Sequence, residues 1–224
     1  MYMTARLIGF EGSDGTGKET QTDLLFKLLE SQGKKVARIS FPRYKQTLGG
    51  SLLYEVMKSE RSKSYGFSKA SPRIASKLYA IDREESLPFL NDLIANNEVV
   101  IFDRYVQSNL LHQGGKFKSD QERIDFAEWL YRLEYDDIGL PKPHEIVYLS
   151  IPFWLSRKRT ELRAEGCDDK LDAVESDIEY VKQGHEAGQF YAKYFRWIVV
   201  SGLEGKVELS RDEIHRKICK KLGY

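Results

Sequence analysis

A glycine-rich segment near the start of the chain carries the residue types that hold phosphate groups. It reads Gly12-Ser13-Asp14-Gly15-Thr16-Gly17-Lys18 and matches the pattern G-x-x-x-x-G-K. Glycines let backbone N–H groups converge on phosphate oxygens, and the helix expected to start here adds partial positive charge. Lys18 supplies a mobile cation for the outer phosphates. The segment therefore predicts a loop that grips a nucleoside triphosphate, with its binding residues between Gly12 and Thr20.

The residue after Lys18 departs from this pattern. Position 19 normally holds Ser or Thr, whose hydroxyl binds Mg²⁺, but here it is Glu19, and Thr20 follows. A carboxylate can bind a hard cation, although it would stand close to the phosphate charge. Glu19 is therefore a candidate metal ligand, and the way in which Mg²⁺ is held stays open.

A second charged group follows another apolar run. Asp103-Arg104-Tyr105 ends the stretch 99–102, and neighbouring side chains of an extended chain point in opposite directions. We expect Asp103 to face Mg²⁺ or its water shell, and Arg104 to capture a second phosphate in bidentate fashion. Taken alone, the tripeptide could also be a surface ion pair.

These residues need a scaffold that brings distant segments together, and the hydrophobic pattern predicts one. Short apolar runs alternate with longer amphipathic stretches, as is typical of parallel β/α architecture. The expected strands are 6–11, 36–41, 99–102, 145–150 and 197–200. The expected helices are 18–31, 48–60, 72–96 with a bend near Pro88, 120–135, 152–165, 172–193 and 211–222. The predicted class is α/β, a three-layer P-loop NTPase fold with a five-stranded parallel sheet flanked by helices, and with a lid.

Composition limits the other possibilities. A chain of 224 residues with 41% hydrophobic residues can bury one core, so a single domain over 1–224 is expected. Because 35 basic residues face 34 acidic ones, no global field would hold nucleic acid or an anionic membrane. Cys167 and Cys219 are too few for a disulfide framework or a cysteine zinc site, and the four histidines have no zinc-like spacing. The start lacks a signal h-region, so we expect a cytoplasmic protein.

Several motifs, taken in order and spacing, resemble the thymidylate kinase (dTMP kinase) family. They are Phe10-Glu11-Gly12 with Gly17-Lys18 and Thr20-Gln21, Phe41-Pro42-Arg43, Tyr79-Ala80-Ile81-Asp82-Arg83, and Asp103-Arg104-Tyr105 with Ser108 and Gln113-Gly114-Gly115. The resemblance runs from about Arg6 through the fifth expected strand. It implies Mg²⁺-dependent transfer of the γ-phosphoryl group of ATP to dTMP, giving dTDP and ADP in dTTP synthesis, by a homodimer.

The resemblance also implies roles on the acceptor side. Arg43 and Arg104 look like clamps on the acceptor phosphate, and Arg83 like a ligand near the base. Tyr79 stands where the family stacks an aromatic ring on thymine. Without the motifs, Tyr79 would be a core aromatic residue, Arg83 part of a solvated helix face and Arg43 a loop cation.

Two more residues complete the implied pocket. Gln113 can both donate and accept, which suits the N3–H and O4 edge of thymine. Tyr105 is placed like the family residue beneath the deoxyribose, where its bulk would oppose a 2′-hydroxyl. The expected substrate-binding residues are Asp14, Arg43, Tyr79, Arg83, Arg104, Tyr105, Ser108 and Gln113.

A basic segment is the expected lid, roughly residues 156–175. Some family members carry a catalytic arginine in the P-loop and others in the lid, and residues 13–16 contain none here. Arg159 and Arg163 are four residues apart and share a helix face. Either one is a candidate for stabilising the transition state, with Arg157 less favoured, although a solvated surface is an equal alternative. Tyr180 or Tyr191 could replace a substrate-contacting tyrosine found in many relatives.

Two other functions stay open as alternatives. A deoxynucleoside kinase shares the loop and the arginines, but its hydroxyl acceptor needs a carboxylate base and a Glu-Arg-Ser type motif at 103–105. A nucleotide-binding protein without turnover would follow if Glu19 had disabled metal binding, yet Lys18 and Asp103 are retained. Because one methyl group is worth roughly 1–3 kcal/mol in a pocket, dUMP is expected to be a slower substrate rather than an excluded one.

Overall fold

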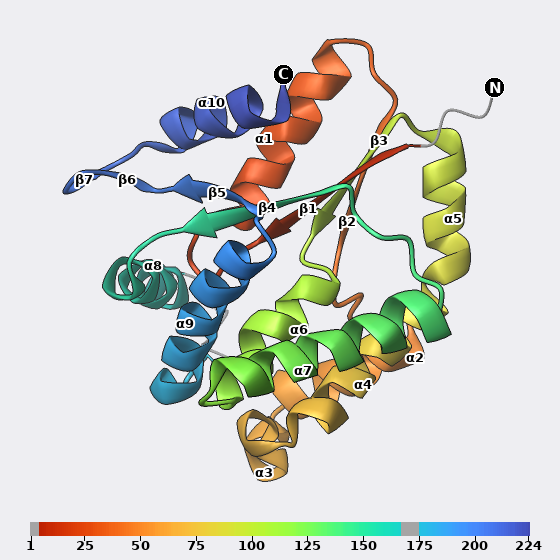
Figure 1. The fold of residues 1–224 in the computed structure, drawn as a ribbon, viewed down its shortest axis with the longest axis vertical. Helices are drawn as coiled ribbons and strands as arrows, with labels where there is room; N and C mark the ends of the chain where they lie inside the picture. The colour runs from red at the N-terminus through yellow and green to blue at the C-terminus, as the bar shows by residue number, and fades with distance from the viewer. Residues whose placement is uncertain (1–4, 167–174) are drawn as a thin grey trace.

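The computed structural model describes residues 5–166 and 175–224, and its centre is a five-stranded parallel sheet in the order β2-β3-β1-β4-β5 (Figure 1). The strands are β1 (Arg6–Glu11), β2 (Val36–Ser40), β3 (Val99–Asp103), β4 (Glu145–Ser150) and β5 (Ile198–Ser201). A short antiparallel pair, β6 (Leu203–Glu204) and β7 (Val207–Glu208), follows. The predicted five-stranded sheet is confirmed.

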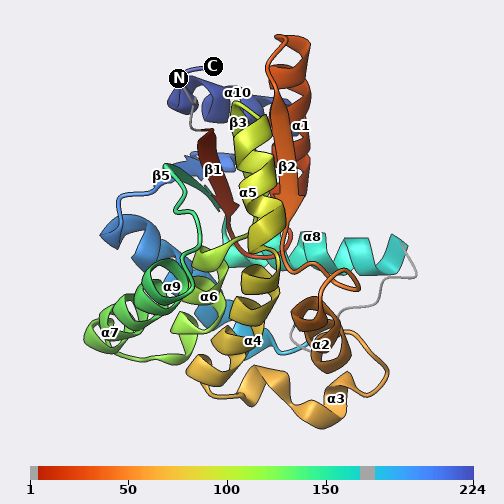
Figure 2. The ribbon, with the colours of Figure 1, turned by 90° about the vertical axis from the view of Figure 1, so that its right-hand side faces the viewer.

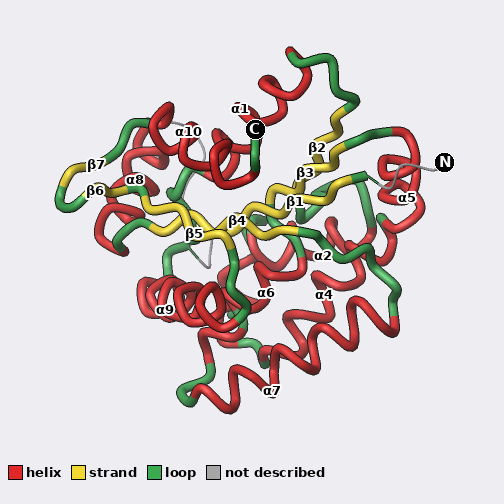
Figure 3. The backbone as a smooth tube through the Cα atoms, turned by 45° about the horizontal axis from the view of Figure 1, so that its top comes forward, coloured by secondary structure: helices red, strands yellow, loops and turns green. Residues whose placement is uncertain are grey.

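Helices cover both faces of the sheet, which gives three layers (Figure 3). One face carries α1 (Lys18–Ser31) and α10 (Arg211–Leu222), and the other carries α5 (Leu87–Asn96), α6 (Val106–His112), α7 (Asp120–Tyr131) and α9 (Ile178–Tyr194). Beyond the carboxyl ends of the strands lie α2 (Leu48–Met57), α3 (Ser62–Tyr65), α4 (Pro72–Glu85) and α8 (Phe153–Gly166) (Figure 2). The predicted α/β class and layering are confirmed.

The central strands are buried on both faces, and alternation along each strand divides their side chains between two cores. Leu7 and Phe102 pack on the side of α5, α7 and α9. Ile8 and Ile101 pack against Leu25 of α1 and the apolar face of α10. These cores fix the strands, so that the loops at their carboxyl ends have a rigid base.

Several helical segments differ from expectation. The stretch 72–96 is two helices, because Pro88 has no N–H for an interior turn and instead lies in the first turn of α5. The stretch 120–135 changes after Tyr131 into a π-helix, η3 (Arg132–Asp137). Short α3 and α6, with the 3₁₀ turns η1 (Phe67–Lys69) and η2 (Gly114–Lys116), are too brief to give a periodic pattern.

The expected lid, residues 156–175, falls partly on α8, whereas 167–174 and with them Cys167 lie outside the described residues. The helix expected from residue 172 is described from Ile178, where Asp177 accepts from Tyr180 N as its N-cap. Over the described ranges 5–166 and 175–224, every helix is too short or too polar to cross a membrane.

Candidate active site

The glycine-rich loop joins β1 to α1, as predicted. Lys18 Nζ donates to Gly12 O at 2.8 Å and to Ser13 O at 2.7 Å, so its side chain folds back over the loop. Thr16 Oγ1 donates to Ser13 O at 2.8 Å. Burial, together with the charge of Arg104, lowers the pKa of Lys18 to about 8. The loop thus holds its cation in place with its own carbonyl groups.

Helix α8 lies directly against this loop. Gly15 has φ +77°, and a Cβ there would stand 2.5 Å from Ser156 O, so only glycine fits. Ser156 Oγ donates to Asp14 O. The helical part of the expected lid is therefore in contact with the phosphate loop.

The two candidate lid arginines of α8 point to different places. Arg163 lines the cavity beside the loop and forms an ion pair with Glu175 at 2.6 Å. Arg159 pairs with Glu208 of β7, and its Nη1 reaches Gly15 O at 3.4 Å. Only Arg163 faces the cavity in this structure.

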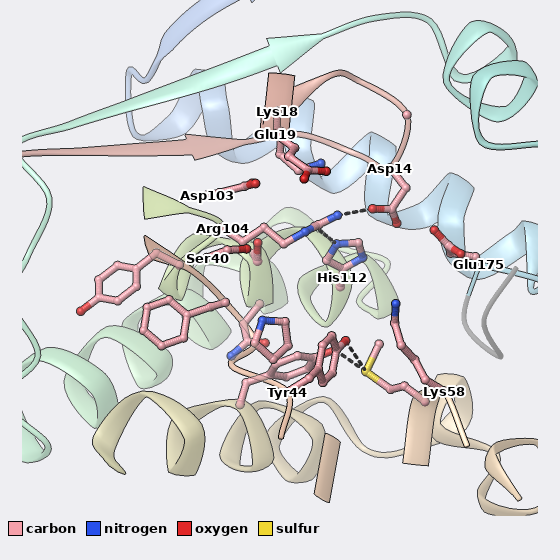
Figure 4. Close-up of a pocket in the computed structure, with 18 of the residues that line it drawn as sticks. Asp14, Lys18, Glu19, Ser40, Tyr44, Lys58, Asp103, Arg104, His112 and Glu175 are labelled. Atoms are coloured by element: carbon pink, nitrogen blue, oxygen red, sulfur yellow. Dashed lines mark hydrogen bonds and ion pairs between the residues drawn. The ribbon is translucent and has the colours of Figure 1, made fainter. Parts of the chain in front are cut away.

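A cavity of about 520 Å³ opens beside the loop at the carboxyl ends of β1, β2 and β3 (Figure 4). This volume suits a small-molecule ligand. Residues predicted for the site that line it are Asp14, Gly15, Gly17, Lys18, Glu19, Thr20, Tyr79, Arg83, Asp103, Arg104, Tyr105, Ser108 and Arg163. The fold therefore brings the loop, the tripeptide 103–105 and part of α4 around one space.

Arg104 is the cation at the centre of this cavity. Its guanidinium forms an ion pair with Asp14 of the loop, and its Nη1 lies 3.3 Å from His112 Nε2 (Figure 4). The residue has φ +66°, a costly conformation for a side chain, while its N–H donates to Phe10 O at 3.1 Å. The chain leaves the extended form at Arg104, and both Asp103 and Arg104 line the cavity.

The charged groups in the cavity shift one another's pKa values. Burial alone would raise the pKa of Asp14, but Arg104 and Lys18 hold it well below its usual range. Burial would lower the pKa of Arg104, yet Asp14 and Asp103 raise it, so the guanidinium stays charged. Burial lowers the pKa of His112 to about 4, which leaves its ring neutral and able to accept from Arg104 at neutral pH.

Glu11 connects the end of β1 to α6. Its buried carboxylate accepts from Tyr105 N at 2.9 Å and from Ser108 Oγ at 2.6 Å. Burial raises the pKa of Glu11 to about 7, although Ser108 and Arg104 oppose the shift. Ser108, predicted to bind substrate, therefore lines the cavity with its hydroxyl donated to Glu11.

Aromatic rings form much of the wall. Tyr105 stacks on Phe102 with ring centroids 4.4 Å apart, and Tyr79 Oη donates to Met57 Sδ at 3.1 Å. Tyr180 also lines the cavity and is thus the better placed of the two tyrosines proposed from the sequence.

Three residues named in advance lie away from this wall. Tyr191 is a core residue whose Oη donates to Arg123 O. Gln113 is fully buried, and its Nε2 donates to Tyr180 Oη at 2.9 Å, so it stands behind that ring. Arg43 turns toward α4 and α5, where it donates to Ser86 Oγ at 3.1 Å and covers the ring of Phe89.

The motifs do not single out Asn109 and His112, although both line the cavity. A signal was available in the spacing. Once Tyr105 and Ser108 are taken to face the site, a helix starting at 106 brings Asn109 and His112 to the same side. His112, one of the four histidines that lack zinc-like spacing, lies beside Arg104.

The two candidate metal ligands differ in their surroundings. Asp103 is buried at the end of β3, and its charge acts on both Lys18 and Arg104. Glu19 is exposed, and its backbone oxygen accepts from Thr22 Oγ1. Within the described part of the chain, no group of three or more metal-binding side chains gathers. A magnesium ion that is also bound by phosphates needs only one or two carboxylates, so Asp103 fits such an ion.

Comparisons with known proteins agree with this arrangement. The model of the thymidylate kinase family matches residues 10–214. The thymidylate kinase of Mycobacterium tuberculosis (strain H37Rv) is 31% identical over 201 residues, which cover 87% of this chain and 90% of that protein. The Plasmodium falciparum enzyme is 25% identical over 96% of this chain and 90% of its own length. The solved thymidylate kinase of Candida albicans has the same fold, with a TM-score of 0.72 and 21% identity over 98% of this chain and 92% of that one. As the motifs predict, the chain belongs to the thymidylate kinase family.

Proposed function

We propose that this chain is a kinase that transfers the γ-phosphoryl group of ATP to dTMP, giving dTDP and ADP. The observation that carries the proposal is the ion pair between Arg104 and Asp14. It sets a second cation beside Lys18, so that one cavity can hold a donor phosphate at the loop and an acceptor phosphate at Arg104.

In this mechanism the chain positions the reactants and neutralises charge. An acceptor phosphate is already a nucleophile and needs no general base. The loop N–H groups and Lys18 hold the β- and γ-phosphates, while Arg104 holds the acceptor in line. Arg163, already in the cavity wall, supplies positive charge where the transferred group becomes exposed between donor and acceptor.

Mg²⁺ is the proposed cofactor, with Asp103 as its main protein ligand, directly or through water. When bound, it would neutralise phosphate charge during transfer. Glu19 is the second candidate, at the exposed side of the same cavity.

Release of ADP tests the proposal. Purified protein with ATP and Mg²⁺ should release ADP when dTMP is added and far less when thymidine is added. Turnover with thymidine instead would identify a deoxynucleoside kinase. Absence of dTMP-dependent turnover in folded protein that binds ATP would identify a nucleotide-binding protein without activity.

We also propose that the enzyme is a cytoplasmic homodimer. The family resemblance supports this, and the exposed apolar side chains Leu48 of α2 and Ile74 of α4 are compatible with a buried contact. Sedimentation equilibrium should give about twice the monomer mass, and a monomer at micromolar concentration would contradict the dimer.

A further inference from the structure

The phosphate loop has a buried contact that its own motif does not supply. Ser13 Oγ lies 3.3 Å from Nδ1 of His185, a residue of α9 that is 172 positions away along the chain. Ser13 and His185 are 4% and 7% exposed, so bulk water cannot take the place of either partner. The loop is therefore tied to α9 by a hydrogen bond between two buried side chains.

A second residue of α9 sets the direction of this hydrogen bond. Gln189 Nε2 lies 3.0 Å from His185 Nε2. An amide nitrogen can only donate, so His185 Nε2 accepts and the ring proton lies on Nδ1. Burial lowers the pKa of His185, although Glu186 opposes the shift, so the ring is neutral at neutral pH. Nδ1–H thus donates to Ser13 Oγ, and the ring adds no positive charge beside the phosphates.

Ser13 is the residue on which the inner hydrogen bonds of the loop converge. Its carbonyl oxygen accepts from Lys18 Nζ at 2.7 Å and from Thr16 Oγ1 at 2.8 Å. These local bonds give the loop its shape, but they do not fix its place in the molecule. Any displacement of Ser13 would carry the Lys18 cation with it.

Helix α9 is a firm support for such a contact, because it packs closely on both sides of His185. It lies between α8 and α6 (Figure 1). A Cβ at Gly188 would stand 2.5 Å from Tyr148 Oη of β4, and a Cβ at Gly115 would stand 2.7 Å from the backbone of Gln183. The backbone of α9 is thus held against the sheet and against η2, and the ring of His185 has little freedom to move.

We propose that His185 is a positioning residue that fixes the place of the phosphate loop through Ser13 and so sets the affinity of the site for the triphosphate of ATP. The inference deepens the proposed function and rests on it, because it assumes that the loop holds the phosphates of ATP.

The test compares the Kd for ATP of His185→Leu with that of wild type by calorimetric titration. We expect this Kd to rise about tenfold, because one buried hydrogen bond no longer fixes the loop. The Kd for dTMP should stay unchanged. His185→Asn should recover much of the ATP affinity, since its amide nitrogen can donate from near the place of Nδ1. A histidine that only fills space would leave the Kd for ATP at the wild-type value in folded His185→Leu, and that result would overturn the proposal.

Ser13→Ala tests the other end of the same hydrogen bond. This variant removes a single oxygen atom and should raise the Kd for ATP as much as His185→Leu does. The double variant should bind ATP no more weakly than either single variant. If the two increases multiply instead, the residues act independently and the proposal fails. If His185→Leu does not fold, Ser13→Ala decides, and a wild-type Kd for ATP in that variant would overturn the proposal.

His215→Leu is the matched control. His215 is a half-buried histidine of α10, and its Nε2 lies 3.4 Å from Cys219 Sγ. Its replacement should leave the Kd for ATP unchanged. Because titration needs no turnover, it also separates this inference from the proposed function. If wild type binds ATP but releases no ADP with dTMP, the kinase proposal fails, and the ratio of Kd values still decides the role of His185.

Discussion

The proposed donor and acceptor sides of the cavity are built in different ways. On the donor side, Lys18 and Thr16 donate to carbonyl groups of their own loop, those of Gly12 and Ser13, which lie three to six residues away along the chain. On the acceptor side, Arg83 is held by Glu134, 51 residues away. A short motif can therefore specify the first site by itself, whereas the second exists only after the whole domain has folded.

Two contacts couple the sides. The ion pair between Asp14 and Arg104 spans 90 residues, and Glu11 meets Ser108 across 97. Both begin in β1 or in the loop that follows it, and they end at Arg104, directly after β3, and at Ser108 of α6. These two contacts thus fix the position of the acceptor wall relative to the phosphate loop, as in-line transfer between two phosphates requires.

The largest effect is expected from breaking the donor side. Lys18→Ala removes the cation held over Gly12 and Ser13, so turnover should fall by roughly 10²–10³-fold. Steady-state ADP release with dTMP measures the loss. Because the loop contacts are local, far-ultraviolet circular dichroism should be unchanged.

Lys35→Ala provides the control, since Lys35 is an exposed lysine beyond the end of α1. Turnover near the wild-type level in Lys18→Ala would show that the loop cation is dispensable and would remove the basis of the donor assignment.

A second experiment asks which carboxylate serves the metal. Asp103→Asn and Glu19→Gln each remove one charge with little change of shape. We expect Asp103→Asn to raise the Mg²⁺ concentration for half-maximal rate by about 10–100-fold, because the buried carboxylate adjoins Lys18 and Arg104. Glu19→Gln should have the smaller effect, since its side chain is exposed. The reverse order would make Glu19 the metal ligand in place of the usual hydroxyl.

The contrast between the sides also explains what the sequence could predict. Lys18 and its loop follow from one contiguous motif, and the strands follow from their apolar runs. Glu134 could not be foreseen, because its partner Arg83 is distant and a π-helix sets its direction. Arg43 and Gln113 were carried over from motifs that fix position along the chain but not side-chain direction. In the structure, Arg43 turns to Phe89 and Gln113 lies behind Tyr180.

A smaller effect is expected at Tyr105, which tests the acceptor side through shape alone. The ring stacks on Phe102, and its Oη has no hydrogen-bond partner within the described residues. Tyr105→Phe should therefore keep the preference for dTMP over its ribose analogue. Tyr105→Ala should relax that preference, and it should lower the free energy of unfolding by about 3–5 kcal/mol through the cavity left behind.

The ratio of kcat/KM values for the two nucleotides measures the preference independently of folded fraction. Loss of preference in Tyr105→Phe would assign the selectivity to the hydroxyl, and retained preference in Tyr105→Ala would move it to another residue.

The smallest effect concerns Glu11, which belongs to both sides, and it appears as a pH dependence of stability. Its pKa is about 7 in the folded state against an ordinary value of 4.5. Between these values the folded state binds the extra proton, so this carboxyl group makes the free energy of unfolding fall as pH rises from 4.5 to 7. Glu11→Gln should remove that fall. Urea unfolding at pH 5 and pH 7.5 measures it.

The comparison between variants is essential, because His112 acts in the opposite direction. The pKa of His112 is lowered to about 4, so its contribution to the free energy of unfolding grows as pH rises from 4 toward 6.5. If only the wild type were measured, this rise would mask the fall caused by Glu11. Glu84→Gln, on the exposed face of α4, removes the same charge without burial and should parallel the wild type. If Glu11→Gln also runs parallel, the carboxylate is already ionised at pH 5. The hydrogen bonds that Glu11 accepts from Tyr105 N and Ser108 would then lower its pKa by more than burial raises it. The contact of Glu11 with α6 would in that case be stronger than the raised pKa implies.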